Sequence, residues 1–188
     1  MKKQLAFFVD AKRCIGCFTC AMACKNQYHQ DAGIKWRDVH PLAPKDYPLT
    51  ERAFYSLACN HCEKPACLAA CPFKAYHKRE DGIVAFDRSK CKGAGYCVDA
   101  CPYGAPKYNT EALKAEKCNF CFQRQDAGLK PACVQGCPTK ALQVVDLATF
   151  KEPGTVHYPP GFAKADTNPS IRFRVAATPK IAERKKQD

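Results

Sequence analysis

Long apolar runs are absent from this sequence of 188 residues. Its longest mainly apolar stretches include Leu5–Val9 and Ala141–Val145, whereas a helix that crosses a bilayer needs about 18 or more such residues. The stretch near the N-terminus is also too short for a secretory signal, because Asp10, Lys12 and Arg13 end it. We therefore expect no membrane span and no export signal of the chain's own.

Motifs for nucleotide binding and for hydrolysis are missing as well. Gly93 and Gly95 lie inside a cysteine-rich loop, not between a strand and a helix as a phosphate-binding loop requires. No Ser/His/Asp or paired-carboxylate arrangement can be argued from the spacing. The histidines outside the cysteine groups form no spaced metal-binding set and are expected at the surface: His29, His40, His77 and His157. We therefore expect no substrate chemistry in the chain itself.

Cysteine, in contrast, is abundant, with 15 residues in the chain. Such a number indicates cross-linking by disulfides or by metal. The odd count and the gaps of mostly two or three residues argue against a disulfide framework, because Cys-x2-Cys pairs are typical of metal and redox sites. The sequence therefore favours metal-bound thiolates.

The cysteines fall into four groups. The third, Cys91–Pro102, has the frame of the bacterial ferredoxin motif C-x2-C-x2-C-x3-C-P, in which three thiolates bind one iron–sulfur cluster and the fourth binds a neighbouring cluster. Three of the four groups end in Cys-Pro. Zinc sites also use Cys-x2-Cys pairs, but they do not call for this repeated ending, so iron–sulfur clusters are favoured. The cysteines are, group by group, Cys14, Cys17, Cys20 and Cys24; Cys59, Cys62, Cys67 and Cys71; Cys91, Cys97 and Cys101; and Cys118, Cys121, Cys133 and Cys137.

The third group departs from the motif at one position. Ala94 stands where the motif has its second cysteine, and a methyl group cannot bind iron. This site should hold a cluster with one iron fewer, or it should take a ligand from elsewhere. A [3Fe–4S] cluster and a [4Fe–4S] cluster completed by water or hydroxide are the two alternatives.

An internal repeat predicts the fold class. Leu5–Val9 and Ile83–Phe86 have the composition of strands, and each is followed by an Asp and then, four residues after that Asp, by a cysteine. The repeat predicts two pseudo-symmetric ferredoxin-like units in an α+β fold, with loop insertions and an extended C-terminal tail. Pro65–Ala70 is expected to form a helical turn, Ala141–Val145 a closing strand, and residues 122–132 a surface loop.

Residues 25–58 form an insertion without cysteine that is rich in aromatic residues. Within it, Ile34–His40 and Arg52–Leu57 are expected to be short strands. The insertion is expected to keep water from the clusters, to offer a docking surface, or to do both.

The composition changes again near residue 151, where scattered Pro and Gly precede the basic run Arg184–Lys186. We expect residues 1–150 to form a double ferredoxin-like domain and residues 151–188 an extended arm that docks onto a partner, disorder being the alternative. Ile171–Val175 alternates between apolar and basic residues and could add one edge strand.

The formal net charge of +12 would by itself suggest a nucleic-acid partner. That figure counts the thiols as neutral, whereas metal-bound cysteines are deprotonated. Four oxidised clusters at roughly −2 each would leave about +4. We therefore expect no nucleic acid, and a basic zinc protein that binds nucleic acid is the remote alternative. Three lysines that flank cysteines are candidates for offsetting cluster charge, a solvated face being the alternative: Lys90, Lys92 and Lys117.

His61 lies between Cys59 and Cys62, which makes it a possible ligand. Because four cysteines are already available to that site, we predict that His61 is a hydrogen-bond donor near the cluster sulfurs.

Several stretches together resemble a known family. They are Phe7–Asp10 before Cys14-Ile-Gly-Cys17, then Cys59-Asn-His-Cys62-Glu-Lys-Pro-Ala-Cys67, His77-Lys-Arg-Glu-Asp-Gly82 and Ala100-Cys-Pro-Tyr-Gly-Ala-Pro106. Over about residues 4–150 the chain is similar to the four-cluster iron–sulfur subunit of molybdopterin oxidoreductase complexes, most of all that of dimethyl sulfoxide reductase. The tail lies outside the resemblance.

The resemblance implies how the groups pair, because in that family the first group pairs with the last and the two middle groups pair together. One cluster would take Cys14, Cys17, Cys20 and Cys137, and a second would take Cys118, Cys121, Cys133 and Cys24. A third would take Cys59, Cys62, Cys67 and Cys101. The fourth would take Cys91, Cys97 and Cys71, with Ala94 in place of a ligand. Three [4Fe–4S] clusters and one [3Fe–4S] cluster are expected, four [4Fe–4S] clusters being the alternative.

The resemblance also implies a non-catalytic subunit that relays electrons. The Cys14 cluster would face a molybdopterin-containing catalytic subunit, and the Ala94 cluster, with a raised potential, would face an integral membrane anchor subunit that reacts with quinone. The chain would be membrane-associated through these partners, on the periplasmic face by co-export or, alternatively, on the cytoplasmic face. A subunit of a hydrogenase or of another soluble reductase complex is the alternative function.

Overall fold

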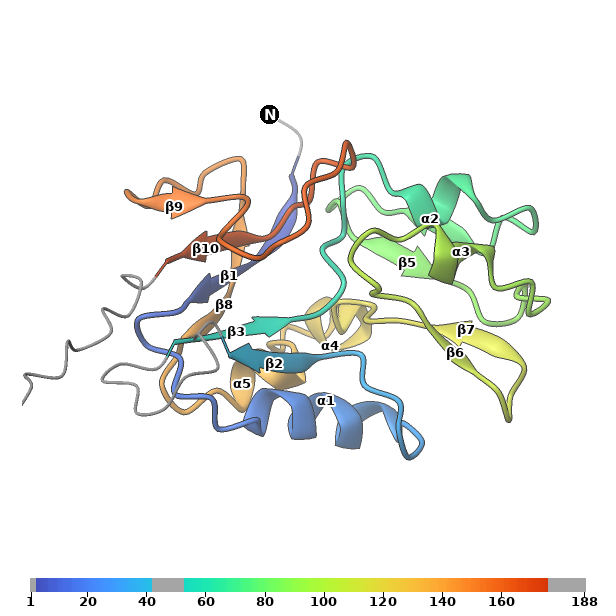
Figure 1. The fold of residues 1–188 in the computed structure, drawn as a ribbon, viewed down its shortest axis with the longest axis horizontal. Coiled ribbons are helices and arrows are strands. Elements are labelled where there is room, and N and C mark those ends of the chain that lie inside the picture. Colours follow the sequence, from blue (N-terminus) through green and yellow to red (C-terminus); the bar gives the residue numbers. More distant parts are fainter. Residues whose placement is uncertain (1–2, 42–52, 176–188) are drawn as a thin grey trace, which may run out of the picture.

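Short strands and helices joined by long loops make up this computed structural model, which describes residues 3–41 and 53–175. The α+β composition expected from the sequence is present, and Figure 1 shows the elements spread along an elongated molecule. In chain order they are β1 (Leu5–Asp10), α1 (Thr19–Tyr28), β2 (Asp38–Pro41), β3 (Phe54–Leu57), α2 (Ala66–Ala69), β4 (Tyr76–Lys78), β5 (Val84–Phe86), α3 (Tyr96–Asp99), β6 (Lys107–Asn109), β7 (Lys114–Glu116), α4 (Phe122–Asp126), α5 (Ala132–Gln135), β8 (Leu142–Asp146), β9 (Thr155–Val156) and β10 (Arg172–Arg174).

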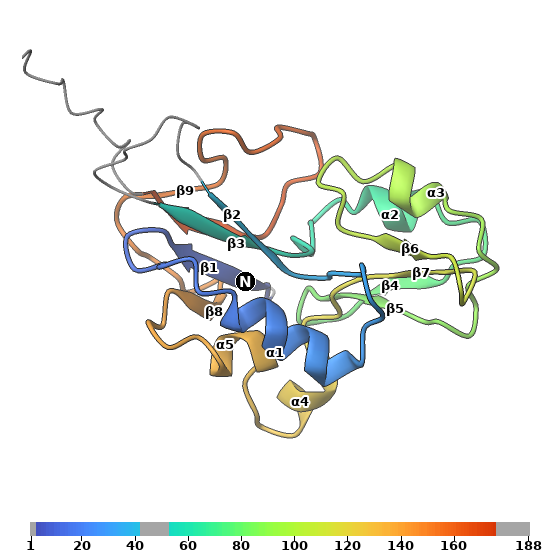
Figure 2. The ribbon, with the colours of Figure 1, turned by 60° about the horizontal axis from the view of Figure 1, so that its bottom comes forward.

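A four-stranded sheet with the order β8-β1-β10-β9 forms one end of the molecule. Its strand β1 runs antiparallel to β8 and parallel to β10. The apolar side chains of β1 from Ala6 to Val9 are almost fully buried, and the ring of Phe7 stacks on that of Phe120 with 4.1 Å between centroids. In Figure 1 the opposite end carries α2, α3 and the hairpins β4–β5 and β6–β7, and Figure 2 shows α1, α4 and α5 below the sheet end.

The strand β10 occupies a different position from the one expected. The alternation of Ile171–Val175 suggested an edge strand, but β10 lies inside the sheet, between β1 and β9. Its alternate side chains explain the placement, because Ile171 and Phe173 are buried and Phe173 packs against the ring of Tyr55. The strands β9 and β10 are therefore part of the main sheet, and Ile171 and Phe173 are part of its core. The basic run at 184–186 lies outside the described residues.

The repeat of strand, Asp and cysteine loop has a local structural counterpart. Asp10 Oδ1 accepts the backbone N–H of Lys12 at 3.0 Å, and Asp87 Oδ1 accepts that of Ser89 at 2.9 Å. Both carboxylates thus make the same turn two residues onward. The strands before them differ in setting, since β1 lies in the four-stranded sheet and β5 in a two-stranded hairpin. The pseudo-symmetry of two whole units stays a prediction.

The surface loop expected at residues 122–132 contains a helix, α4, so that expectation was wrong in part. Cys121 has a left-handed backbone with φ 51°, which ends the preceding loop and starts the helix. Side chains then close the remainder on itself, because Arg124 Nε donates to the Lys130 carbonyl at 2.9 Å and Gln125 Nε2 to that of Phe120 at 2.7 Å. Gln and Arg are good helix formers, and this outweighed the Gly and Pro that follow.

Strands β2 and β3 pair antiparallel within the cysteine-free insertion, shorter than the predicted ranges. Val39 and Tyr55 are buried and belong to the main core. The described part of the insertion therefore packs inward, as a cover over the cysteine groups would. Residues 42–52 lie outside the described residues.

Candidate metal centres

All fifteen cysteines are free thiols, and the structure gathers them from distant parts of the chain. Cys14 is the first example. Burial raises the pKa of its thiol, and negative charge on Cys20, Cys137 and Cys17 raises it further. These four cysteines also line one small cavity. The end of the last group has thus come to the first group.

A second small cavity is lined by Cys59, Cys62, Cys67 and Cys101. Burial together with the charge of its neighbours raises the pKa of Cys62 to about 11 and that of Cys67 to about 12. Here the end of the third group has come to the second group.

Cys24 lies with three cysteines of the last group. Burial raises the pKa of Cys133 to about 11, and negative charge on Cys24 and Cys121 contributes to the rise. Burial likewise raises the pKa of Cys118 well above its ordinary value, with Cys24 the next cause. The helices α1 and α5, which carry cysteines of these groups, pack against each other.

The remaining thiols are Cys71, Cys91 and Cys97. Burial raises the pKa of Cys97, and negative charge on Cys71 and Cys91 adds to the rise. Ala94 belongs to the same loop and is exposed to solvent. This group therefore offers three thiols and one open side.

The four groups form a continuous row. Cys24 is influenced by the charge of Cys20 in the first set, and Cys118 by that of Cys59 in the third. The third and fourth sets meet at Tyr76, whose pKa is raised by burial and by the charges of Cys97 and of cysteines in the third set. The first two sets include cysteines of α1 and α5, and the last two include cysteines of α2 and α3; Figure 1 shows α1 and α5 near the sheet end and α2 and α3 at the other end.

Unpaired polar atoms among the described residues test whether iron–sulfur clusters fit these sites. Buried polar groups are normally hydrogen-bonded, and cluster sulfurs accept hydrogen bonds. The following buried atoms have no partner: Trp36 Nε1, Arg37 Nε and Nη2, Tyr55 Oη, Asn60 Nδ2 and Oδ1, His61 Nε2 and Tyr76 Oη. Nearly all of them are donors within the segments that carry or cover the cysteines, so the residues fit clusters. In the described part of the chain, no three or more His, Cys, Asp or Glu side chains are already arranged around a point that could hold a metal ion.

His61 is oriented as a donor. Its Nδ1 accepts the backbone N–H of Val84 at 3.1 Å, which assigns the ring proton to the buried, unpartnered Nε2. Burial keeps the pKa of His61 well below its ordinary value, and the positive charges of Lys117, Lys78 and Arg37 act in the same direction. The imidazole is therefore neutral, in keeping with the predicted role as a donor near cluster sulfurs.

The three lysines singled out from the sequence differ in environment. Lys117 is buried, and its Nζ donates to the carbonyls of Val84 and Cys118. Lys90 and Lys92 are exposed, and Lys90 lies 3.8 Å from the Asp87 carboxylate. Lys90 and Lys92 thus lie on a solvated face. Of the three lysines, only Lys117 is placed to compensate charge inside the protein.

Arg37 is a residue that sequence reasoning missed. It lies in the insertion, far from any cysteine in sequence, and its side chain is 1% exposed. Burial acts to lower its pKa, but negative charge on Cys133, Cys118, Cys20 and Cys24 outweighs that effect and raises it. An arginine in an aromatic stretch without cysteine carries no local signal of this position.

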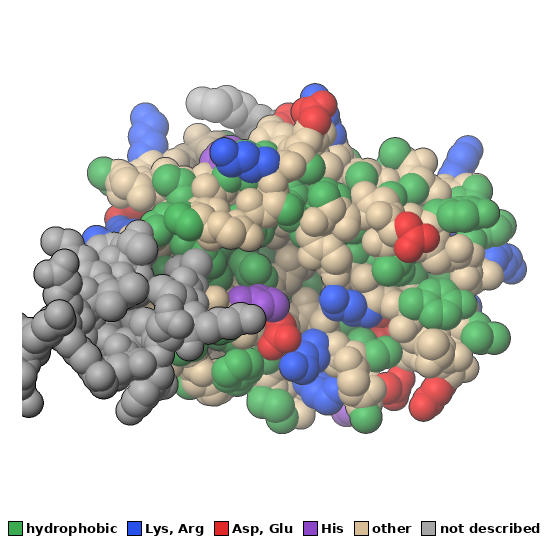
Figure 3. Space-filling view, viewed as in Figure 1, with side chains coloured by type: hydrophobic (Ala, Val, Ile, Leu, Met, Phe, Trp, Pro, Cys, Tyr) green, Lys and Arg blue, Asp and Glu red, His purple; other side chains and the backbone are tan. Residues whose placement is uncertain are grey.

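Apolar side chains are exposed at both ends of the row. Ile15, Phe18 and Met22 lie beside the exposed Cys17. At the other end the exposed residues are Phe73, Tyr96, Tyr108 and Leu113, and Figure 3 shows apolar side chains gathered on that end of the visible face. Among the described residues, none of the helices has the length and apolar character to cross a membrane.

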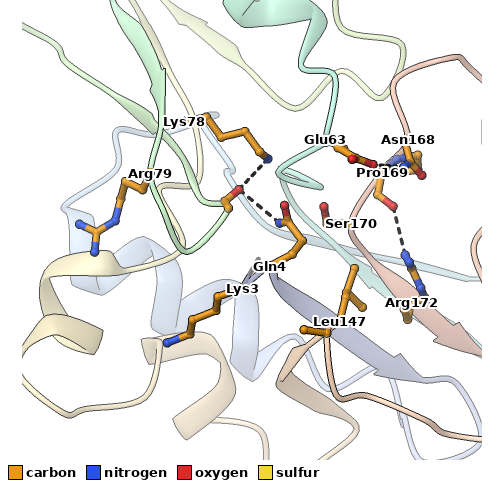
Figure 4. Close-up of a pocket in the computed structure, with 12 residues that line it drawn as sticks. Lys3, Gln4, Glu63, Lys78, Arg79, Leu147, Asn168, Pro169, Ser170 and Arg172 are labelled. Carbon is orange, nitrogen blue, oxygen red and sulfur yellow. Dashed lines mark hydrogen bonds between the residues drawn. The ribbon is translucent and has the colours of Figure 1, made fainter. Parts of the chain in front are cut away.

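A pocket away from the cysteine groups collects basic side chains. Figure 4 shows Lys78 and Gln4 converging on the carbonyl of Gly82, while Arg172 bonds the carbonyl of Pro169. Gln4 thus joins the start of β1 to the β4–β5 hairpin, Lys78 bonds within that hairpin, and Arg172 bonds within its own segment. The pocket contains none of the predicted ligands.

Residues 50–147, more than half of the chain, match a protein family described as a 4Fe-4S dicluster domain. This protein belongs to the 4Fe-4S dicluster family. Iron–sulfur clusters are therefore its cofactors, and the ferredoxin-like, α+β character expected from the sequence is confirmed at that level.

Relatives of this dicluster protein are named as parts of reductases. It is 43% identical over 150 residues to one chain of the anaerobic dimethyl sulfoxide reductase of Escherichia coli (strain K12), a match that covers 76% of this chain and 73% of the relative. It is 41% identical over 146 residues to the thiosulfate reductase electron transfer subunit PhsB of Salmonella typhi, with 76% of each chain covered. Identity to one subunit of the tetrathionate reductase of Salmonella typhimurium is 38% over 148 residues, covering 78% of this chain and 59% of the relative. The resemblance stated from the motifs is confirmed.

Proposed function

We propose that this chain relays electrons through four iron–sulfur clusters, between a molybdopterin-containing catalytic subunit and an integral membrane subunit that reacts with quinone or quinol. The observation that carries the proposal is the continuous row of four cysteine groups across the length of the molecule. A row of redox centres is what a relay needs. The name of one relative, an electron transfer subunit, supports the same function.

The proposed ligand sets are those that the family resemblance implied, and the proximity of the thiols supports them. They are Cys14, Cys17, Cys20 and Cys137; Cys24, Cys118, Cys121 and Cys133; Cys59, Cys62, Cys67 and Cys101; and Cys71, Cys91 and Cys97. When bound, the clusters would supply one-electron transfer. The protein's part is to hold them in sequence, keep water out and balance their charge.

The two ends of the row are proposed to meet different partners. Cys17 is exposed beside Ile15 and Phe18, which suits contact with the catalytic subunit. The exposed Ala94 end, with Tyr96 and Leu113, would face the membrane subunit. Residues 176–188 are proposed to extend the contact with a partner.

The site at Ala94 is proposed to hold a [3Fe–4S] cluster, and the other three sites [4Fe–4S] clusters. Three thiols and a methyl group support this assignment. Because Ala94 is exposed, a solvent-derived ligand completing a fourth [4Fe–4S] cluster is the competing outcome.

Anaerobic purification of the chain with its native partners tests the function. We expect about 15 irons per chain, molybdenum in a co-purifying subunit, a membrane protein in the same complex, and a [3Fe–4S] EPR signal in the oxidised state. Zinc in place of iron would exclude the relay. Clusters without molybdenum, in a complex with hydrogenase activity, would instead support the alternative.

The location is proposed to be the membrane, through the partner subunits, on the periplasmic face. Protease added to spheroplasts should then digest this chain while a cytoplasmic marker survives. Protection of the chain until the cells are lysed would place it on the cytoplasmic face.

A further inference from the structure

Arg37 is a buried cation that makes no ion pair with a described carboxylate. Its guanidinium carbon lies 4.3 Å from the centroid of the Phe7 ring. Its Nη1 donates to the carbonyl and to the hydroxyl of Ser56, at 3.2 and 3.0 Å. Within residues 3–41 and 53–175, no carboxylate lies within ion-pair distance of it. A buried charge left without a counterion strongly destabilises a fold, so the guanidinium requires a negative partner of another kind.

The surroundings of Arg37 point to that partner. Ser56 Oγ, which accepts from Arg37, lies 3.2 Å from Cys20 Sγ, so a short polar chain leads from the guanidinium to the first cysteine set. On the other side, the Phe7 ring that Arg37 covers stacks on Phe120, whose backbone N–H donates to Cys118 Sγ at 3.4 Å. The guanidinium therefore lies between the first and second cysteine sets.

The remaining donors of Arg37 have no hydrogen-bond acceptor within the part of the chain that the structure describes. Only Nη1 is used by Ser56, while Nε and Nη2 are buried and without a partner. A guanidinium carries its donors in a rigid planar fork and stays charged at all ordinary pH values. It is thus suited to serve two anionic centres at the same time.

We propose that Arg37 is the shared countercharge of the two iron–sulfur clusters that the Cys14 and Cys24 sets would hold, and that its free N–H groups donate to the sulfurs there. The proposal rests on the proposed function for the presence of these clusters. Each cluster becomes more negative on reduction, so a fixed positive charge and hydrogen bonds to sulfur stabilise the reduced form. Arg37 therefore raises the reduction potential of both clusters together.

Lys117 provides the matched comparison. It is also a buried cation, at 2% exposed, but its charge lowers the pKa of Cys67 in the third set, against the rise caused by burial. Removing the charge of Lys117 should therefore change the reduction potential of the cluster in the third set. Lys92 is exposed and flanks Cys91, so it serves as the control for charge in general.

EPR-monitored redox titration of the iron-loaded complex tests the proposal with Arg37→Gln, Arg37→Lys, Lys117→Gln and Lys92→Gln. We expect Arg37→Gln to lower two of the four potentials, with the ratio of reduced to oxidised cluster at a given potential falling about tenfold, which is about 59 mV for a one-electron couple. Arg37→Lys should leave both reduction potentials close to their wild-type values, because the positive charge remains. Lys117→Gln should shift the signal of the third set and leave that of the Cys14 set in place, and Lys92→Gln should shift none of the four.

Two results would overturn the proposal: Arg37→Gln leaving all four potentials unchanged, or shifting all four equally. If Arg37→Gln incorporates too little iron to titrate, the wild type labelled with ¹⁵N-arginine decides. Pulsed EPR of the reduced wild type should then show coupling to an arginine nitrogen that is lost in Arg37→Lys, and its absence from the wild type would refute the donation. The proposed function fails on a different observation, namely a wild-type complex in which four clusters are not found.

Discussion

At the scale of single residues, the chain departs from a regular cluster motif at Ala94. If the missing thiolate alone determines the cluster type, Ala94→Cys should convert a [3Fe–4S] cluster to a [4Fe–4S] cluster. The EPR signal of the oxidised protein at that site should disappear, and the iron content should rise by about one per chain. Ala94→Ser tests the volume of the side chain with a poorer ligand. A wild-type protein without a [3Fe–4S] signal would contradict the assignment.

Gly93 is constrained by its neighbours in the same loop. Its φ is +78°, and an added Cβ would overlap the carbonyl oxygen of Leu113. Gly95 has a similar φ of +76° with open space around it, so it is the matched control. We expect Gly95→Ala to cost about 1 kcal/mol from backbone strain alone, and Gly93→Ala to cost clearly more. The measurement is the urea concentration at which cluster absorbance is lost, and equal shifts for the two variants would show that the contact with Leu113 is unimportant.

At the scale of elements, β10 is the clearest case of a segment whose role depends on the fold. Phe173 is fully buried, so Phe173→Ala should destabilise the protein by about 3–5 kcal/mol. Val156→Ala on β9, where the side chain is 37% exposed, should change stability by less than about 0.5 kcal/mol. Urea titrations of both iron-loaded variants measure the difference. A Phe173→Ala variant with the stability of the wild type would show that β10 is dispensable.

The segment after β10 allows a separate experiment on docking. Ending the chain after residue 175 should leave the urea midpoint of the iron-loaded protein unchanged while reducing the recovery of partner subunits in a pull-down. Truncation after residue 170 removes β10 as well and should impair folding. If the chain that ends after residue 175 still recovers the partner subunits in full, residues 176–188 have no role in docking.

At the scale of the whole molecule, the cofactors and the protein are expected to stabilise each other. The hairpins are short, and the core contains the charges of Arg37 and Lys117 without carboxylate partners in the described chain. Removing the clusters leaves these charges uncompensated, and metal sites of this kind contribute directly to folding. We therefore expect removal of iron by a chelator under anaerobic conditions to abolish cooperative unfolding and to expose the chain to protease.

Rebuilding the clusters with iron and sulfide is the control for that experiment, because protease resistance should return with the visible absorbance. An iron-free protein that keeps its circular dichroism and a sharp unfolding transition would contradict the expectation. In that case the sheet formed by β1, β8 and β10 would be sufficient for stability without cofactors.

The sequence by itself determined the chemistry of this protein. Closely spaced cysteines, the Cys-Pro endings and the alanine at position 94 are local features, and a cluster motif holds several of its ligands within one short loop. The strands β1 and β5, the Asp turns after them and the hairpin at Gly82 follow from local composition in the same way.

Only the tertiary structure decided which distant segments meet. The parallel pairing of β1 with β10 joins residues more than 160 positions apart, and no local pattern encodes such a contact. Arg37 and Ser56 reach the first two cysteine sets only because the β2–β3 hairpin folds over them. A buried charge is defined by what surrounds it in three dimensions, and for Arg37 those surroundings come from four separate parts of the chain.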